Sequence, residues 1–201
     1  MPAPRLYLIT PPLTDAAAFA APFAAALDAG DVACVLVRAT ESAVIGRLAP
    51  IAQRRGIACL VRDPRHAVES DCDGVHVDGV SATLEAALAA MKPQRIVGVG
   101  GLASRHDAMS AAEADVDYVM FGAPDEPRDF AEIRERIAWW AEIFNPPCVG
   151  YAQALDEVAA LAGAGADFVA VCDVVWSDPR GPAAGVEAVE RALTAAREPT
   201  A

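Results

Sequence analysis

Four charged residues stand where apolar runs of the chain end, and their types suit a reaction on a small molecule. Arg38 closes the second run, Asp63 and Asp78 follow the third and fourth, and Asp173 follows the last. If these runs are parallel strands of one barrel, all four residues lie at the same rim, where barrel enzymes keep their sites. Asp63 has a second explanation, because an aspartate directly before Pro64 can simply cap the following helix.

Other side chains point less clearly to chemistry. His76 lies inside an apolar run, so it is either an acid or base or, as we expect, a buried histidine whose hydrogen bonds are satisfied. His106 falls on the first turns of a predicted helix and should be solvated. Trp176, just past the last run, could line a pocket or only cover the end of the barrel. The cysteines show no paired metal-ligand spacing and mostly lie in apolar runs, so we expect reduced core residues: Cys34, Cys59, Cys72, Cys148 and Cys172.

The composition argues against several classes of protein. Hydrophobic residues make up 54% of the chain, which is enough for a sizeable core, and the formal net charge is −12. Nucleic acid and anionic membrane surfaces attract clustered Lys and Arg, so we expect neither as a partner and a small molecule instead. The longest apolar stretch, Ala16 to Leu27, contains Pro22 and is shorter than the roughly 20 residues of a membrane span. We expect a cytoplasmic protein.

Short apolar runs alternate with longer alanine-rich runs along the whole chain. The apolar runs are nearly continuous rather than alternating, which is typical of strands covered on both faces in a parallel sheet. The predicted strands are Arg5 to Thr10, Val32 to Arg38, Ile57 to Val61, Gly74 to Val77, Arg95 to Val99, Tyr118 to Gly122, Cys148 to Gly150 and Phe168 to Val171. The predicted helices are Thr14 to Ala29, Glu41 to Arg55, Pro64 to Glu69, Ser81 to Met91, Ser104 to Glu113, Pro127 to Phe144, Gln153 to Ala162 and Pro182 to Arg197.

The joints between these elements favour a closed barrel over an open sheet. Small or acidic residues stand directly before several strands, as in Gly30-Asp31 and Gly165-Ala166-Asp167. An open doubly wound sheet would carry a glycine-rich phosphate loop after its first strand, where this chain has Thr10-Pro11-Pro12. The 201 residues therefore predict one α/β domain over residues 1–201, a (β/α)8 TIM barrel of minimal size.

An ordered set of motifs resembles thiamine phosphate synthases and their TenI relatives. The motifs are Tyr7-Leu8-Ile9-Thr10, Leu36-Val37-Arg38, Arg62-Asp63, Gly74-Val75-His76-Val77, Gly98-Val99, Asp117-Tyr118 through Phe121-Gly122, and Gly163 through Asp167. No single motif is specific, but their order and spacing cover nearly the whole chain. The resemblance implies thiamine biosynthesis, in which an aminopyrimidine pyrophosphate condenses with a thiazole phosphate and pyrophosphate leaves.

The resemblance also implies the parts of the site at the C-terminal rim. These are Mg²⁺ held by carboxylates, an Arg and Lys clamp, and a hydroxyl-rich loop, which together stabilise the leaving group. Arg38 keeps the arginine of the clamp, but the lysine is absent from Ala39-Thr40. Asp63 keeps one potential magnesium carboxylate beside the cation of Arg62, and Asp78 stands near the place of the second. The implied Mg²⁺ site is thus incomplete.

The remaining rim positions carry further replacements. The residues expected to bind ligand here are Gly101, Gly122, Gly150, Asp173 and Trp176. The loop after Gly122 lacks the Thr-x-Thr-Lys motif, and Ala123 replaces the histidine of TenI tautomerases. Gly150-Tyr151 takes the place of a phosphate turn. Asp173 takes the place of a serine, where a carboxylate in a cup of backbone N–H groups would repel a phosphate.

Several functions stay open on this pattern. The chain is a thiamine phosphate synthase-like transferase whose catalytic groups are largely degraded, or a non-catalytic ligand-binding or regulatory TenI-like barrel, or an enzyme with a changed small-molecule substrate. The ligand in each case is a small molecule, phosphorylated if the family's chemistry is kept. With so many rim groups replaced, we expect little or no condensation activity.

The predicted helix from Pro127 to Phe144 suggests a homodimer. One face gathers large apolar residues and should pack on the barrel: Phe130, Ile133, Ile137, Trp140 and Phe144. Trp139 should point almost opposite, toward solvent and beside Arg136 and Glu132. Exposed tryptophans commonly belong to contacts, so we expect the helix to form a dimer interface.

Overall fold

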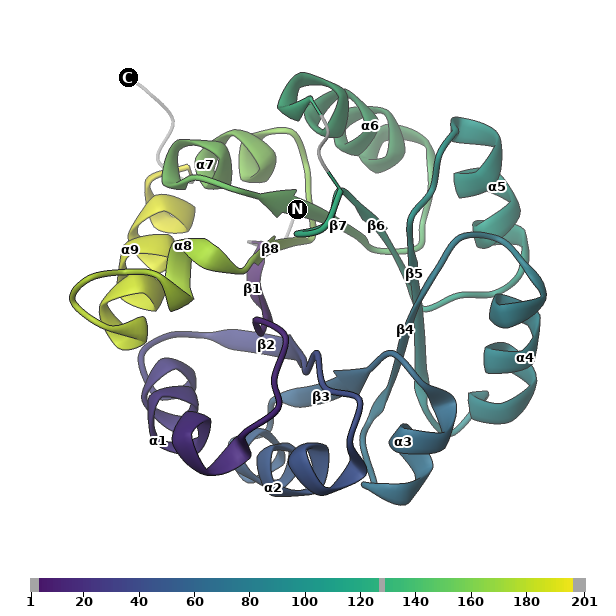
Figure 1. Cartoon of the computed structure of the whole chain (residues 1–201). Helices are drawn as coiled ribbons and strands as arrows, with labels where there is room; N and C mark the ends of the chain where they lie inside the picture. The colour runs from purple at the N-terminus through teal and green to yellow at the C-terminus, as the bar shows by residue number, and fades with distance from the viewer. Residues whose placement is uncertain (1–3, 127–128, 197–201) are drawn as a thin grey trace.

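A computed structural model describes residues 4–126 and 129–196, in which eight parallel strands close into a barrel within a ring of helices (Figure 1). The strands pair in chain order, and β8 closes the barrel against β1. The strands are β1 (Arg5–Ile9), β2 (Val32–Leu36), β3 (Ala58–Val61), β4 (Gly74–Asp78), β5 (Ile96–Gly100), β6 (Tyr118–Phe121), β7 (Cys148–Ala152) and β8 (Phe168–Val171). The predicted barrel is confirmed.

The helices follow the strands around the outside. They are α1 (Ala16–Leu27), α2 (Ser42–Gln53), α3 (Pro64–Glu69), α4 (Ala82–Met91), α5 (Arg105–Glu113), α6 (Phe130–Ile143), α7 (Leu155–Gly163), α8 (Asp173–Trp176) and α9 (Pro182–Ala195). Five begin at a side chain that accepts a backbone N–H bond: Asp15, Asp63, Ser81, Ser104 and Asp129. Pro127, where the sequence starts the sixth helix, lies outside the described residues.

Local predictions fail at several places. The sequence carries the second strand to Arg38, but β2 ends at Leu36. The sequence ends the seventh strand at Gly150, but β7 continues through Tyr151 to Ala152, since both following residues are apolar and stay in the sheet. The sequence also misses α8, because a single turn of four residues is too short to show helical periodicity.

The core has an outer and an inner part. The outer part packs the helices on the strands, and the inner part fills the barrel with Tyr7, Tyr118, Tyr151 and smaller residues. Gly98 of β5 makes room inside, because a Cβ there would lie 1.9 Å from the Tyr118 ring. A glycine in the strand thus allows a large polar ring to cross the barrel interior.

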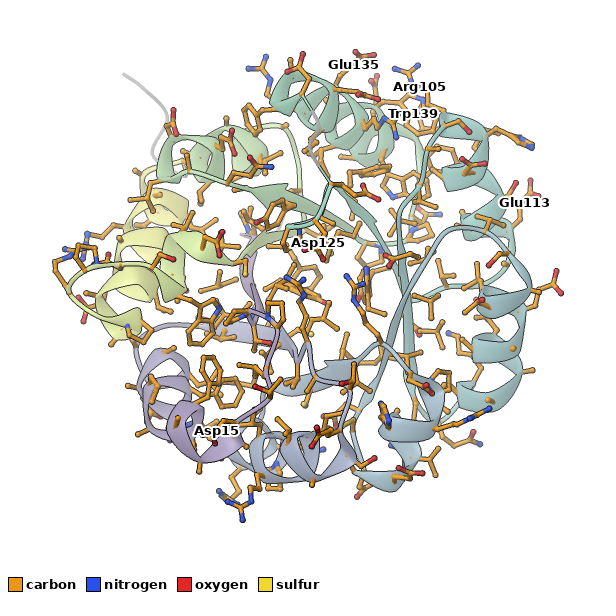
Figure 2. All side chains as sticks on the ribbon, in the orientation of Figure 1. Asp15, Arg105, Glu113, Asp125, Glu135 and Trp139 are labelled. Carbon is orange, nitrogen blue, oxygen red and sulfur yellow. The ribbon has the colours of Figure 1, made fainter. Side chains whose placement is uncertain are left out.

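The structure corrects the expected exposure of Trp139 on α6. Its ring is half-buried, 5.2 Å from the Phe144 ring, and the guanidinium carbon of Arg105 lies 4.9 Å from its centroid. Arg105 comes from α5 and also pairs with Glu135 of α6 at 2.6 Å. Figure 2 shows Arg105, Glu135 and Trp139 close together at the edge of the molecule. The spacing within one helix cannot reveal a side chain that the neighbouring helix supplies.

The opposite face of α6 lies as predicted. Ile133, Ile137 and Trp140 are buried against the barrel, and the flanking Phe130 and Phe144 pack beside them. Arg136, expected beside Trp139, donates instead to the carbonyl oxygens of Leu102 and Ala103. The homodimer through this helix stays a prediction.

None of the helices within residues 4–126 and 129–196 is long and apolar enough to cross a membrane.

Candidate functional site

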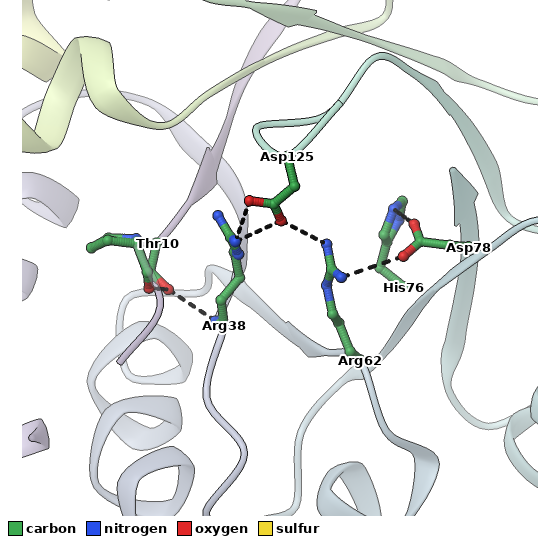
Figure 3. Close-up of polar contacts among 7 residues, drawn as sticks. Thr10, Arg38, Arg62, His76, Asp78 and Asp125 are labelled. Carbon is green, nitrogen blue, oxygen red and sulfur yellow. Dashed lines mark hydrogen bonds and ion pairs between the residues drawn. The ribbon is translucent and has the colours of Figure 1, made fainter. Parts of the chain in front are cut away.

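A row of charged side chains crosses the C-terminal mouth of the barrel (Figure 3). Asp125, in the loop between β6 and α6, receives bonds from Arg38 Nη2 to both carboxylate oxygens, at 2.6 and 2.8 Å. The same carboxylate lies 3.8 Å from Arg62 Nη2, and Arg62 Nη1 lies 3.3 Å from Asp78 Oδ2. Residues that follow β2, β3 and β6 are thereby joined with the last residue of β4.

Arg38 is held firmly at this mouth. Its backbone N–H donates to the hydroxyl of Thr10 at the end of β1, at 2.9 Å, and its carbonyl accepts from the N–H of Leu13 at 2.8 Å. Only 12% of its side chain is exposed, against 57% for Asp125. A buried guanidinium with an exposed carboxylate partner is suited to exchange that partner for another anion.

The predicted buried histidine is confirmed, and it faces the barrel interior. His76 Nδ1 lies 2.8 Å from the Tyr118 hydroxyl, which in turn lies 2.9 Å from the Tyr7 hydroxyl. Burial lowers the pKa of His76 to about 4, so the imidazole is neutral near pH 7. Its Nε2 lies 3.9 Å from Asp78 Oδ1, which connects the polar interior with the charged mouth.

Burial also raises the pKa of both tyrosines, Tyr7 and Tyr118, well above the ordinary value. Their hydroxyls therefore keep their protons, and the buried hydrogen-bonded chain carries no net charge.

The carboxylates expected to hold Mg²⁺ do not form a site for it. Asp63 is exposed and caps α3 by accepting from the N–H of Arg65 at 2.8 Å, as its second explanation allowed. Asp78 faces Arg62 instead of a second carboxylate. Within the described ranges, no three His, Cys, Asp or Glu side chains gather in a way that could hold a metal ion. The donor set at this mouth therefore does not fit the implied Mg²⁺.

The three glycines expected to bind ligand have different settings. Gly101 (φ +61°) packs against Asp78 at the rim, and Gly122 (φ +83°) lets the chain leave β6 at a conformation that side chains disfavour. Gly150 lies inside β7 and points outward, since a Cβ there would lie 3.0 Å from Leu161 of α7. Gly150 is therefore a packing position in β7, and the ligand role expected for it stays a prediction.

Asp173 lines a cavity of about 360 Å³ at the rim, together with Asp125 and Tyr151. It lies in the first turn of α8 with its side chain exposed. Its carboxylate contacts the thiol of the neighbouring Cys172, and its expected seat in a cup of N–H groups stays a prediction. Its contribution to this cavity is negative charge on one wall.

Trp176 covers the end of the barrel rather than lining this cavity. Its indole N–H donates to the carbonyl of Ile9 at 2.7 Å, and its ring lies 4.8 Å from that of Phe19 in α1. Of the two roles considered for Trp176, the structure supports the packing role.

Sequence reasoning missed the central carboxylate, Asp125. The loop after β6 is read from the sequence only as lacking hydroxyl groups, and Asp125 is not singled out. The available signal is an acidic residue in the loop that follows β6, at the same end of the barrel as Arg38 and Arg62. Arg62 itself is noted only as a cation beside Asp63.

Comparisons with known proteins agree with one another. The family model described as thiamine monophosphate synthase matches residues 6–175. The thiamine-phosphate synthase of Rhodospirillum centenum is 45% identical over 202 residues, covering 94% of this chain and 97% of the relative. That of Hyphomonas neptunium is 36% identical over 206 residues, covering 93% and 92%.

The solved structures extend the comparison to the fold. A thiamine phosphate pyrophosphorylase from Pyrococcus furiosus aligns with a TM-score of 0.81 at 18% identity, covering 96% of this chain and 97% of that chain. An orotidine 5'-phosphate decarboxylase from Pyrococcus horikoshii aligns with a TM-score of 0.69 at 11% identity, covering 94% of this chain and 99% of that one. At such identities these likenesses concern the barrel alone.

Proposed function

Since the chain belongs to the thiamine monophosphate synthase family, we propose that its C-terminal rim binds the phosphorylated substrates of thiamine phosphate synthesis through Arg38 and Arg62. The family match and the 45% identical relative confirm the family that the sequence motifs resemble. The proposal concerns which groups of this chain meet the substrate.

One observation carries the proposal: two guanidinium groups share the single carboxylate of Asp125. Both hydrogen bonds of Arg38 to Asp125 come from one nitrogen. The guanidinium also contacts the Cys172 thiol, and the N–H groups that face neither partner can bind a phosphate at the same place. The Arg62 contact with Asp125 is long, at 3.8 Å, and is the weaker of the two. A phosphate ester that displaces Asp125 would be bound by two cations, one of them largely buried.

The same geometry supports anion binding without Mg²⁺. A cation at this mouth would lie between carboxylates, and the guanidinium of Arg62 lies between Asp78 and Asp125. We assign no step of the reaction to a metal, because the residues present do not fit one. In this chain the charge that balances the substrate phosphate comes from the arginines.

We propose further that condensation is slow. The lysine of the clamp and the hydroxyl-rich loop after β6 are replaced, and loss of one such stabiliser commonly reduces the rate about a hundredfold or more. Because several are replaced at once, we expect turnover well below that of a relative with the full set. We propose that the protein works in the cytoplasm. All five cysteines are buried and form no disulfide, as is usual for proteins of reducing compartments.

A non-catalytic ligand-binding barrel is the second candidate. It is favoured by the ion pairs themselves, because Arg62, Asp78 and Asp125 are engaged with one another and none is aimed alone at a reacting atom. The two candidates share ligand binding and differ in whether pyrophosphate is released.

Titration calorimetry with thiazole phosphate, paired with an assay of pyrophosphate release, tests the proposal. We expect saturable binding that Arg38→Ala weakens at least fivefold, while Arg105→Ala, on the outer helices, leaves it unchanged. Circular dichroism of both variants verifies the fold. Binding without pyrophosphate release would select the ligand-binding barrel. Absence of binding, or equal binding by Arg38→Ala, would refute the proposed role of the rim.

A further inference from the structure

The opposite, N-terminal mouth of the barrel holds a cavity of about 280 Å³. It arises because the residues at the starts of two strands are small: Ala33 in β2 and Ala58 in β3 both line it. Barrel interiors are normally filled by layers of bulky side chains. Here the layer nearest the N-terminal ends of the strands is under-filled, on the side away from the C-terminal rim.

The lining of this cavity is mainly apolar. Ala33, Ala58, Ile96 and Phe168 line it, all half-buried and packed against the inner core. Each lies in the first two residues of its strand. Half-buried apolar side chains arranged around a hollow lose contact with water when a ligand fills it, and this favours binding of apolar molecules.

The charged groups at this mouth already have partners. Arg5 pairs with Asp31 at 2.7 Å, and Asp117 pairs with Lys92 at 2.7 Å while also accepting from the N–H of Val97. A charged ligand would have to compete with these pairs. The cavity is therefore suited to a neutral molecule.

A polar edge is provided deeper in the cavity. The side chains of Tyr7 and Tyr118 line it, and their hydroxyls are bonded to each other at 2.9 Å. Each phenol oxygen can donate one hydrogen bond and accept two. The pair is therefore not saturated by this bond, the bond of Tyr118 to His76 and the bond of Tyr7 with the Cys34 thiol. A ligand N–H or O–H can join it, and the phenol rings offer edges or faces to a flat ligand.

We propose that the N-terminal mouth is a second binding site that takes a small, neutral, aromatic molecule with one polar edge. An apolar cavity of about 150 Å³ accepts benzene, so a cavity of 280 Å³ has room for two fused rings. The inference does not rest on the proposed function, since the two sites lie at opposite ends of the strands.

Titration with indole, followed by NMR of the full chain, tests the inference. We expect saturable shifts of the amides of Ala33, Ala58 and Phe168, with no comparable shifts at Arg38 or Asp125. Ala58→Leu fills the cavity and should weaken indole binding at least tenfold, and Ala33→Val is a second filling variant should the first fail to fold. Arg62→Asn, at the other rim, is the matched control and should bind indole like the wild type.

Two results would overturn the inference. One is the absence of saturable shifts at millimolar indole, or binding that persists in both filled variants. The other is a dimer that Ile96→Asp converts to a monomer in analytical ultracentrifugation, because a second copy of the chain would then occupy this face.

Discussion

Replacing Asp125 with Asn should strengthen binding of thiazole phosphate at the C-terminal rim. The carboxylate accepts from Arg38 at 2.6 and 2.8 Å and lies 3.8 Å from Arg62, so in the proposed binding mode it competes with the phosphate for both arginines. Asparagine keeps the size of the side chain and removes its charge. The two arginines would then meet the ligand without an internal competitor.

The expected gain in affinity for thiazole phosphate depends on how exposed the Arg38–Asp125 ion pair is. Two unit charges 4 Å apart interact by about 1 kcal/mol in water and about 4 kcal/mol near a protein surface. Asp125 is 57% exposed, so solvent screening places the value near the lower figure. About 1 kcal/mol corresponds to a roughly fivefold increase in affinity.

Titration calorimetry at low and moderate salt measures this gain. The fivefold difference should shrink as ionic strength rises, because the interaction is between partly exposed charges. Glu113→Gln is the matched control: it removes the same charge from α5, at the outer edge of the molecule (Figure 2), and should change affinity little. Equal or weaker binding by Asp125→Asn would refute the reasoning that Asp125 competes with the phosphate.

Three further predictions concern other residues. Asp173→Ser should also strengthen thiazole phosphate binding, as it removes negative charge from the rim cavity, and unchanged affinity in calorimetry would mean that this side chain does not face the ligand. Burial lowers the pKa of His76 from 6.5 to about 4, so the unfolded chain binds a proton at this residue more readily than the folded chain. The wild type should therefore lose up to about 3 kcal/mol of folding stability as pH falls from 6.5 to 4. Urea unfolding of His76→Gln should show a smaller loss over that range, and an identical pH dependence would contradict this assignment. Trp139→Ala should shift the homodimer expected through α6 toward monomer in light scattering, and a monomeric wild type would contradict the dimer.

The strands were predictable because their residues are nearly continuously apolar, and both faces of a barrel strand are indeed buried. The outcome at Gly150 shows the limit of this signal. Glycine commonly marks a turn, but here it provides space for Leu161, and the apolar residues after it continue the strand. The same residue type thus has two physical uses that a single sequence does not separate.

The charged mouth was predictable only in part. Arg38 and Asp78 follow directly from their positions at strand ends. The contact of Asp125 with Arg38 depends on the path of the loop after β6. The burial of Trp139 depends on Arg105, which the neighbouring helix supplies. Both are contacts between segments far apart along the sequence, so neither composition nor periodicity carries information about them.

The central claim is that arginines, and not Mg²⁺, provide the positive charge that binds the substrate phosphate. Calorimetry with thiazole phosphate, in EDTA and in excess Mg²⁺, tests it most directly with the wild type, Arg62→Asn and the control Arg65→Asn on α3. We expect equal wild-type affinity in both conditions, about tenfold weaker binding by Arg62→Asn in EDTA, and no change in Arg65→Asn. Wild-type binding that requires Mg²⁺ and is unaffected by Arg62→Asn would contradict the account.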